Sequence, residues 1–364
     1  MIREVLDAFD YGGTLVSSER FGNGHINDTY LVKIKKADGR EGYVILQHMN
    51  TKIFKEPEFL MENIQNVTSF LRNCIVENGG DPERETLNVI CAKDGKPFYI
   101  DSEGKYWRSY IFIEGAKGYD KVEGIEDCYE SAAAFGNFQR LLADYQAETL
   151  HETIHGFHDT KARFAVFKKA VAEDVCGRAA SVRDEINFYL QREEVANVFG
   201  DLLAKGEIPL RVTHNDTKLN NVLLDEVTRK GVCVIDLDTV MPGLAMNDFG
   251  DLIRFGASTA AEDEIDLSKV WCDMKLFEAY AKGFIDGCGG KLTSKEIELL
   301  PMGAKVMTYE CGMRFLTDYL QGDVYFKTHR EGHNLDRTRT HIKLIQDMET
   351  KWDVMNNIVS DIYK

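Results

Sequence analysis

Three polar residues in the second half of the chain stand at the ends of short apolar runs. Asp216 and Asn221 lie in a polar loop that separates two apolar runs within residues 211–224. Asp236 directly follows another strand-like run, residues 232–235. Short apolar runs bounded by polar turn residues are typical of buried strands. We therefore expect neighbouring strands whose ends bring two carboxylates and one amide together.

The spacing of these residues meets the needs of magnesium-dependent phosphoryl transfer. Protein kinases place an aspartate in the catalytic loop, an asparagine a few residues later and a metal-binding aspartate after a following strand. Asp216, Asn221 and Asp236 repeat this order. In this interpretation Asp216 orients the attacking hydroxyl, while Asn221 and Asp236 hold the metal on the nucleotide phosphates. The structural alternative is a pair of hairpin loops closed by Asx turns.

The first 113 residues are rich in strand signals. A helical pattern at residues 57–78 interrupts strand patterns at residues 28–34, 43–47, 87–92, 97–100 and 106–113. Gly22 and Gly24 lie in a loop just before the first of these strand patterns. Glycine allows backbone N–H groups to approach a phosphate closely, which predicts nucleotide binding there. An ordinary tight turn is the alternative.

The pattern changes to mostly helix after residue 113, apart from the strands around Asp216 and Asp236. We therefore predict an α+β, two-lobed, protein-kinase-like fold. A small β-rich N-terminal lobe at residues 1–113 would bind the nucleotide. A larger, mostly helical C-terminal lobe at residues 114–364 would carry the catalytic loop.

Charge and composition exclude several other classes of protein. The chain has 60 acidic and 44 basic residues and a net charge of −16, so we expect no binding to nucleic acid or to an anionic membrane surface. No apolar run reaches the ~18 residues of a membrane-spanning helix. Acidic residues near the start argue against a signal peptide, so a cytoplasmic protein is expected. The eight cysteines form no CxxC pair, which favours free thiols.

Three further residues, Asp248, His214 and Lys218, are expected to support the catalytic loop rather than to bind the metal. The triplet at residues 248–250 spells a metal-binding motif of protein kinases, but it lies too far from Asp216 and no apolar strand precedes it. We instead predict that Asp248 caps a helix that begins at the next residue. His214 is expected to hold the loop by hydrogen bonds. Lys218 either neutralises the transferring phosphoryl group or is a solvated loop lysine.

Two other features stand apart from the catalytic loop. Arg314 lies amid apolar residues in a helical pattern, so it either forms a buried ion pair or points into a cleft. Residues 151–155 spell H-E-x-x-H, the arrangement of some zinc sites, but we favour a structural or surface role for His151, His155 and His158.

Taken together, these motifs resemble the aminoglycoside phosphotransferase and choline kinase-like family of small-molecule kinases. Within that family they are most similar to kinases that act on N-acetylhexosamines. The resemblance runs over nearly the whole chain. It is carried by residues 22–27, 213–221, 235–238, 254–259 and 310–316.

The resemblance implies an ATP-dependent transferase that phosphorylates the anomeric C1 hydroxyl of N-acetylglucosamine (GlcNAc) or N-acetylgalactosamine (GalNAc), with Mg²⁺ as cofactor. It implies direct in-line transfer, with Asp216 as the catalytic aspartate and Asp236 and Asn221 as magnesium ligands. The residues that it places around the sugar are His25, Phe255, Arg314 and Tyr325. A guanidinium in this pocket would repel a cationic acceptor.

The third predicted strand departs from the general kinase pattern. It carries Gln47 where kinases have a lysine that binds the α- and β-phosphates. Gln47 donates a hydrogen bond but brings no charge, so neutralisation is expected from magnesium and the loop with Gly22 and Gly24. Two alternatives stay open. One is a kinase of another small alcohol, such as another hexose, a choline-like or a homoserine-like compound; the other is a weakly active, nucleotide-binding regulatory protein.

Overall fold

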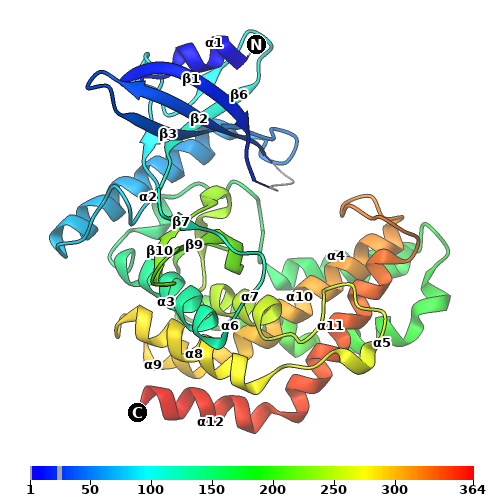
Figure 1. Ribbon diagram of the computed structural model, residues 1–364. Helices are drawn as coiled ribbons and strands as arrows, with labels where there is room; N and C mark the ends of the chain where they lie inside the picture. Colours follow the sequence, from blue (N-terminus) through cyan, green and yellow to red (C-terminus); the bar gives the residue numbers. More distant parts are fainter. Residues whose placement is uncertain (1, 23–26) are drawn as a thin grey trace.

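The computed structural model describes residues 2–22 and 27–364, and these form two lobes (Figure 1). A small antiparallel sheet with few helices makes the N-terminal lobe, and a larger, mostly helical part makes the C-terminal lobe. The predicted α+β, two-lobed, kinase-like architecture is therefore confirmed. No helix in the described part of the chain is long and apolar enough to cross a membrane.

The N-terminal lobe is built on a sheet in which all neighbouring strands are antiparallel. Its order is β1-β2-β3-β6-β4, and β5 pairs with β6. The bounds are β1 Gly13–Arg20, β2 Asp28–Lys36, β3 Glu41–His48, β4 Val89–Ile90, β5 Tyr99–Ile100 and β6 Tyr106–Ile111. β4 and β5 are shorter than predicted. Turns at Gly95 and Gly104, both with positive φ, separate the short strands in this region.

The two faces of this sheet pack against different parts of the molecule. Val44 and Leu46 of β3 are buried in a small core beneath α1 (Ile2–Ala8). Ile45 packs against the large core that continues into the C-terminal lobe. Because side chains alternate along a strand, Gln47 shares the face of Ile45. On the neighbouring strand, Arg108 follows Trp107 of the small core and faces the same side as Gln47.

The helix predicted at residues 57–78 is α2, Pro57–Glu77. Proline at the first helical position fits there because its missing N–H would be unbonded in any case. Leu60, Ile64 and Val67 bury one face of α2 in the large core. In Figure 1, α2 lies beneath the sheet, at the upper edge of the helical lobe.

The C-terminal lobe holds two small antiparallel sheets. One has the order β10-β9-β7 and the other pairs β11 with β8. The bounds are β7 Ala116–Lys117, β8 Arg211–Thr213, β9 Val222–Asp225, β10 Gly231–Val234 and β11 Met241–Gly243. Strands were predicted on both sides of the catalytic loop. The strand leading into it, β8, pairs with β11 rather than with β10.

Helices make up the rest of this lobe. They are α3 Ile125–Leu141, α4 Thr160–Glu173, α5 Arg183–Leu190, α6 Glu193–Ala204, α7 Ala245–Gly256, α8 Met274–Cys288, α9 Ser294–Glu298, α10 Leu300–Gln321, α11 His333–Thr350 and α12 Trp352–Tyr363. Figure 1 shows α12 along the lower edge of the molecule, at the far end from the N-terminal sheet.

A close glycine contact fixes α7 against α10. A Cβ atom on Gly250 would lie 2.2 Å from the carbonyl oxygen of Gly303, and one on Gly303 would lie 2.2 Å from the carbonyl oxygen of Met246. Real Cβ atoms do not approach other atoms so closely, so only glycine fits at these crossing points. The contact places α7, which carries Asp248, beside α10, which carries Arg314.

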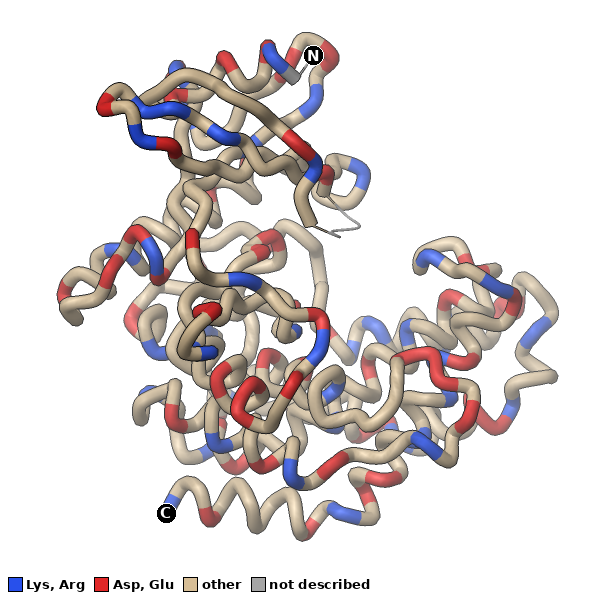
Figure 2. The backbone as a smooth tube through the Cα atoms, in the orientation of Figure 1, with Lys and Arg blue, Asp and Glu red and all other residues tan. Residues whose placement is uncertain are grey.

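Basic and acidic residues are interspersed over both lobes, as Figure 2 shows.

The cysteines are free thiols, as predicted from the absence of a CxxC pair. All eight are free; four of them are buried, and Cys176 is exposed. Burial raises the pKa of the Cys272 thiol to about 12. This thiol is therefore protonated at neutral pH.

Buried His341 on α11 makes stability depend on pH. Its pKa is lowered to about 4, first by burial and then by the guanidiniums of Arg254 and Arg337, against the opposing effect of Glu262. Between pH 6.5 and 4 the unfolded chain therefore binds a proton that the folded chain does not, so stability falls as pH falls. We expect the free energy of unfolding to drop more steeply in the wild type than in His341→Gln, by up to about 1.4 kcal/mol per pH unit.

Chemical denaturation at several pH values checks this expectation. His155→Gln is the control, because the side chain of His155 is 96% exposed. Parallel pH profiles for the wild type and His341→Gln would contradict the assignment of a neutral buried imidazole.

Candidate active site

The catalytic loop after β8 is fixed by a buried carboxylate from α7. Asp248 accepts hydrogen bonds from the backbone N–H groups of His214 (3.0 Å) and Asn215 (2.8 Å). It also accepts one from Nε2 of Gln139 on α3 (2.7 Å). Asn215 has φ 65°, a left-handed conformation that asparagine tolerates better than most residues. The loop is thus held in a strained shape by a neighbouring helix.

The predicted capping role of Asp248 is wrong. Helix α7 begins at Ala245, and Asp248 lies inside its first turn. Its side chain instead points to the catalytic loop, where it accepts hydrogen bonds from the backbone N–H groups of His214 and Asn215. The exclusion of Asp248 from the metal site agrees with this geometry, since both carboxylate oxygens already accept protein hydrogen bonds.

His214 joins the two strand ends that carry the acidic residues. Its Nδ1 accepts the backbone N–H of Asp216 (3.3 Å), so Nε2 carries the proton and donates to the carbonyl oxygen of Ile235 (2.9 Å). Ile235 directly precedes Asp236. The structural role predicted for His214 is therefore confirmed.

The three residues singled out from their spacing come together at these strand ends. Nδ2 of Asn221 donates to the carbonyl oxygen of Asp216 (2.8 Å) and to its Oδ2 (3.0 Å). Asp236 follows β10 in a left-handed conformation, with φ 59°. Its pKa is raised to about 6 by burial and by the negative charges of Asp238 and Asp216. The carboxylates are thus close enough to repel one another.

This donor set fits a magnesium ion. Mg²⁺ prefers oxygen ligands, and Asp236 offers carboxylate oxygens. The amide oxygen of Asn221 accepts no hydrogen bond from a described residue, since only its Nδ2 is bonded. A bound cation would also relieve the repulsion that raises the pKa of Asp236.

Lys218 does not lie free in solvent. Its Nζ is 2.8 Å from Oδ2 of Asp216, and its side chain is 33% exposed. Burial alone would lower its pKa, but the carboxylates of Asp216, Asp236 and Asp251 together outweigh burial and raise it. The geometry therefore disfavours the solvated-lysine alternative and places a cation beside Asp216.

The predicted nucleotide-binding residues are only partly within the described part of the chain. Gly22 has φ 76°, a conformation suited to glycine, while Gly24 lies outside the described residues. Gln47 donates from Nε2 to Oγ1 of Thr29 (3.0 Å) and accepts from Nε of Arg108 (2.9 Å).

Two of the predicted sugar-binding residues lie next to each other. The guanidinium carbon of Arg314 is 5.9 Å from the ring centre of Tyr325, and it also faces the rings of Phe157 and Phe326. The Arg314 side chain is 13% exposed and lies 3.8 Å from Glu310. Of the two roles expected for Arg314, the structure shows the ion pair, with the fully buried Glu310.

The other two predicted sugar residues are placed differently. Phe255 projects from the end of α7, is 41% exposed, and stacks under the guanidinium of Arg254 at 3.7 Å. His25 lies outside the described residues.

A buried chain of side chains connects Arg314 with the catalytic loop. Nδ1 of His158 is 2.8 Å from Oε1 of Glu310, and its Nε2 is 3.2 Å from the carbonyl oxygen of Asn215. The expectation of a structural role for His158 agrees with these contacts. Sequence reasoning missed Glu310, because a glutamate inside a helical pattern gives no sign of what it faces.

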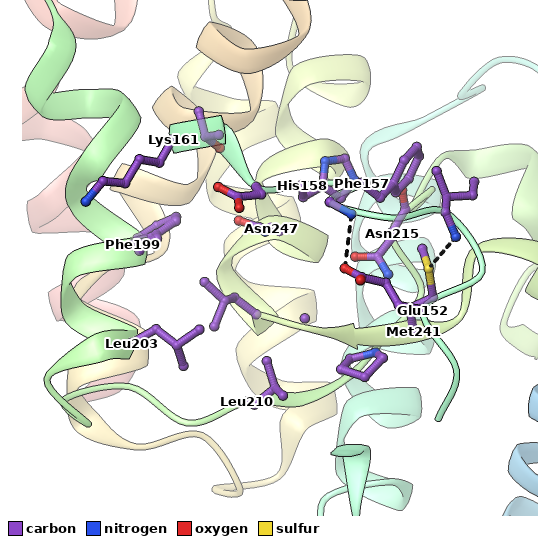
Figure 3. A pocket seen from close by; sticks show the side chains of 18 of the residues that line it. Glu152, Phe157, His158, Lys161, Phe199, Leu203, Leu210, Asn215, Met241 and Asn247 are labelled. Carbon is purple, nitrogen blue, oxygen red and sulfur yellow. Dashed lines mark hydrogen bonds between the residues drawn. The ribbon is translucent and has the colours of Figure 1, made fainter. Parts of the chain in front are cut away.

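A cavity of about 300 Å³ adjoins the same loop (Figure 3). Asn215, Met241 and Phe157 line one part of it, and Phe199 and Leu203 of α6 line another. Its lining includes neither Asp216 nor Arg314. It is therefore a hollow distinct from the residues of the predicted transfer site.

The fold and the loop are those expected of a kinase-like phosphotransferase. The model of a phosphotransferase enzyme family, APH, matches residues 18–270. The chain belongs to this phosphotransferase enzyme family.

Solved structures share the fold over almost the whole chain. An aminoglycoside phosphotransferase from Alicyclobacillus acidocaldarius is 11% identical, with a TM-score of 0.59 and 99% of this chain and 96% of that chain covered. A microcompartment-associated aminopropanol kinase is 14% identical, with a TM-score of 0.56 and 98% of both chains covered. The amicoumacin kinase hAmiN, solved with AMP-PNP, Ca²⁺ and Ami, is 12% identical, with a TM-score of 0.56 and 96% of both chains covered. At these identities the likeness shows the fold alone.

Proposed function

We propose that this phosphotransferase is an ATP-dependent kinase of the anomeric C1 hydroxyl of N-acetylhexosamines, GlcNAc or GalNAc. In this proposal residues 1–113 hold the nucleotide, and residues 114–364 hold the catalytic loop and the sugar. The acceptor pocket is formed by Arg314, Tyr325 and Phe255, together with His25. The observation that carries the proposal is the positively charged, aromatic surrounding of Arg314 beside the catalytic loop.

A second arginine adds to the positive charge of this region. Arg163 of α4 has a lowered pKa, first because of burial and then because of the charge of Arg314. Its Nε is buried and has no hydrogen-bond partner among the described residues. Glu310, the nearest acid to Arg314, already binds His158 and Thr160. This environment disfavours a cationic acceptor and suits the hydroxyl and acetamido carbonyl oxygens of an N-acetylated sugar.

The proposed mechanism is a single in-line displacement. Asp216 accepts a hydrogen bond from the C1 hydroxyl and takes its proton as the oxygen attacks the γ-phosphorus. The bond from that phosphorus to the bridging oxygen breaks, and ADP leaves with a sugar 1-phosphate as the other product. Lys218 stabilises charge next to Asp216. Bound at Asp236 and Asn221, Mg²⁺ would neutralise charge on the phosphates.

The first alternative is a kinase of another small alcohol. Solved structures with this fold include kinases of aminopropanol and of ethanolamine, so amino alcohols need a direct test. ADP release should be measured with MgATP and a panel of GlcNAc, GalNAc, unacetylated hexoses, choline, ethanolamine and homoserine. The proposal predicts the highest kcat/KM with an N-acetylhexosamine. A preference for an amino alcohol would overturn it.

The second alternative is a nucleotide-binding regulatory protein with weak activity. The combination of Asp216, Asn221 and Asp236 argues against it, since binding alone does not require an aspartate at the hydroxyl position. No magnesium-dependent turnover with any member of the panel would favour this alternative.

Arg314→Ala is expected to raise the KM for the sugar about tenfold or more and to change the KM for ATP little. A hydrogen bond to a charged group contributes about 1.5–3 kcal/mol, and only the sugar would lose it. Steady-state kinetics with each substrate varied in turn provides the test. Lys161→Gln is the control, because that lysine pairs with Asp201 at the surface. Equal changes in both KM values would show that Arg314 acts structurally.

A further inference from the structure

The strand position that lacks a lysine lies directly opposite an arginine. In the pairing of β3 with β6, Gln47 is in register with Arg108. Nε of Arg108 donates to Oε1 of Gln47 at 2.9 Å. The guanidinium therefore lies beside the amide of Gln47.

Arg108 is a cation enclosed by the protein. It is 1% exposed, and its Nη1 forms an ion pair with Oδ1 of Asp238. Burial by itself would lower the pKa of Arg108, but Asp238, Tyr110 and Asp236 together outweigh burial and raise the pKa. Burying a charge costs free energy, so the buried guanidinium of Arg108 needs a partner of opposite charge or a ligand.

The guanidinium has one end to spare. Nε is bonded to Gln47 and Nη1 to Asp238, but Nη2 makes no hydrogen bond to any described residue. Nη1 binds Asp238, which lies two residues after Asp236, the proposed magnesium ligand. The guanidinium of Arg108, with its unpaired Nη2, therefore lies next to the proposed metal site.

Asp238 ties this arginine to the segment that follows the glycine loop. Nδ2 of Asn27 donates to Oδ2 of Asp238 (2.8 Å), and Oδ1 of Asn27 accepts the backbone N–H of Asn50 (3.0 Å). One carboxylate of the C-terminal lobe therefore holds two side chains of the N-terminal lobe. Asn27 is the first described residue after the loop that carries Gly22 and Gly24.

We propose that Arg108 is the phosphate-binding cation of the nucleotide site and takes the place of the lysine missing at Gln47. Gln47 and Asp238 position the guanidinium, and its Nη2 group donates to the phosphates of a nucleoside triphosphate. The inference rests on the proposed ATP-dependent function. It adds a protein cation to the neutralising charge expected from magnesium and the glycine loop.

Nucleotide binding without an acceptor tests this inference. Calorimetry should compare MgATP, MgADP and adenosine on the wild type, Arg108→Gln, and the double variant Arg108→Gln/Gln47→Lys. We expect Arg108→Gln to weaken MgATP and MgADP binding about tenfold or more, as for a lost charged hydrogen bond, and to leave adenosine binding unchanged. The double variant should recover much of the affinity for MgATP.

Controls separate phosphate binding from lobe positioning. Arg84 also joins the lobes, through an ion pair with Asp225 at 2.6 Å, but it contacts none of the residues proposed for the nucleotide site. Arg84→Gln should leave MgATP affinity unchanged. If Arg108→Gln fails to fold, Arg108→Gln/Asp238→Asn removes both buried charges together, and the same loss is expected for MgATP and not for adenosine.

The outcomes are distinct. An equal loss of adenosine and MgATP affinity, or no loss of either, overturns the role of Arg108 alone. Failure of Gln47→Lys to restore any MgATP affinity also counts against it. Absence of MgATP binding by the wild type overturns both this inference and the proposed function.

Discussion

Replacing Asp216 by asparagine is expected to lower kcat by about 10²- to 10⁴-fold, the usual contribution of a positioned acid or base. Asparagine keeps an oxygen for the hydrogen bond from Nδ2 of Asn221 at this position, so the loop should keep its shape. It cannot accept the hydroxyl proton, and it leaves Lys218 without its ion pair. Steady-state turnover and the melting temperature should be measured together.

Glu226→Gln is the matched control for this variant. Glu226 is an exposed acid in the turn between β9 and β10, so its loss changes charge by the same amount away from the loop. It should keep normal turnover. Near-normal activity in Asp216→Asn would remove Asp216 from the catalytic role.

Replacing Asp248 by asparagine is expected to destabilise the protein and to inactivate it. Three donors converge on this carboxylate, from His214, Asn215 and Gln139. The amide group of asparagine would place a donor against at least one of them, and a buried donor left unpaired costs about 1–3 kcal/mol. Because two of the donors belong to the catalytic loop, kcat should fall together with stability.

Chemical denaturation and turnover of Asp248→Asn provide the measurements. Asp201→Asn is the control, because Asp201 pairs with Lys161 at the surface and its loss should change stability by less than about 0.5 kcal/mol. Unchanged stability and activity in Asp248→Asn would contradict the role of α7 in holding the loop.

Sequence patterns predicted best the elements that are determined by residues close together in the chain. The periodicity of α2, the strands β2 and β3, and the strand ends that carry Asp216 and Asp236 follow from neighbouring residues. Helix α7 shows the limit. Its start at Ala245 depends on tertiary packing through Gly250 and Gly303, so the pattern placed its beginning four residues too late.

Contacts between distant residues could not be read from local patterns. Asp248 reaches His214 across 34 residues, and Arg108 reaches Asp238 across 130 residues. The absence of a lysine at Gln47 was visible in the sequence, but its neighbour on β6 was not. Strand order and register decide that Arg108, and no other residue of β6, lies opposite Gln47. The lobe boundary at residues 113 and 114 and the roles of the site residues stay predictions.

The position of the phosphate on the product tests the proposed function most directly. The chain should be incubated with MgATP and GlcNAc or GalNAc, and the product examined by ³¹P and ¹H NMR. We predict coupling of the phosphorus to the anomeric proton, which places the phosphate at C1. Coupling to the protons at C6, or no phosphorylated sugar with either acceptor, would contradict the proposal.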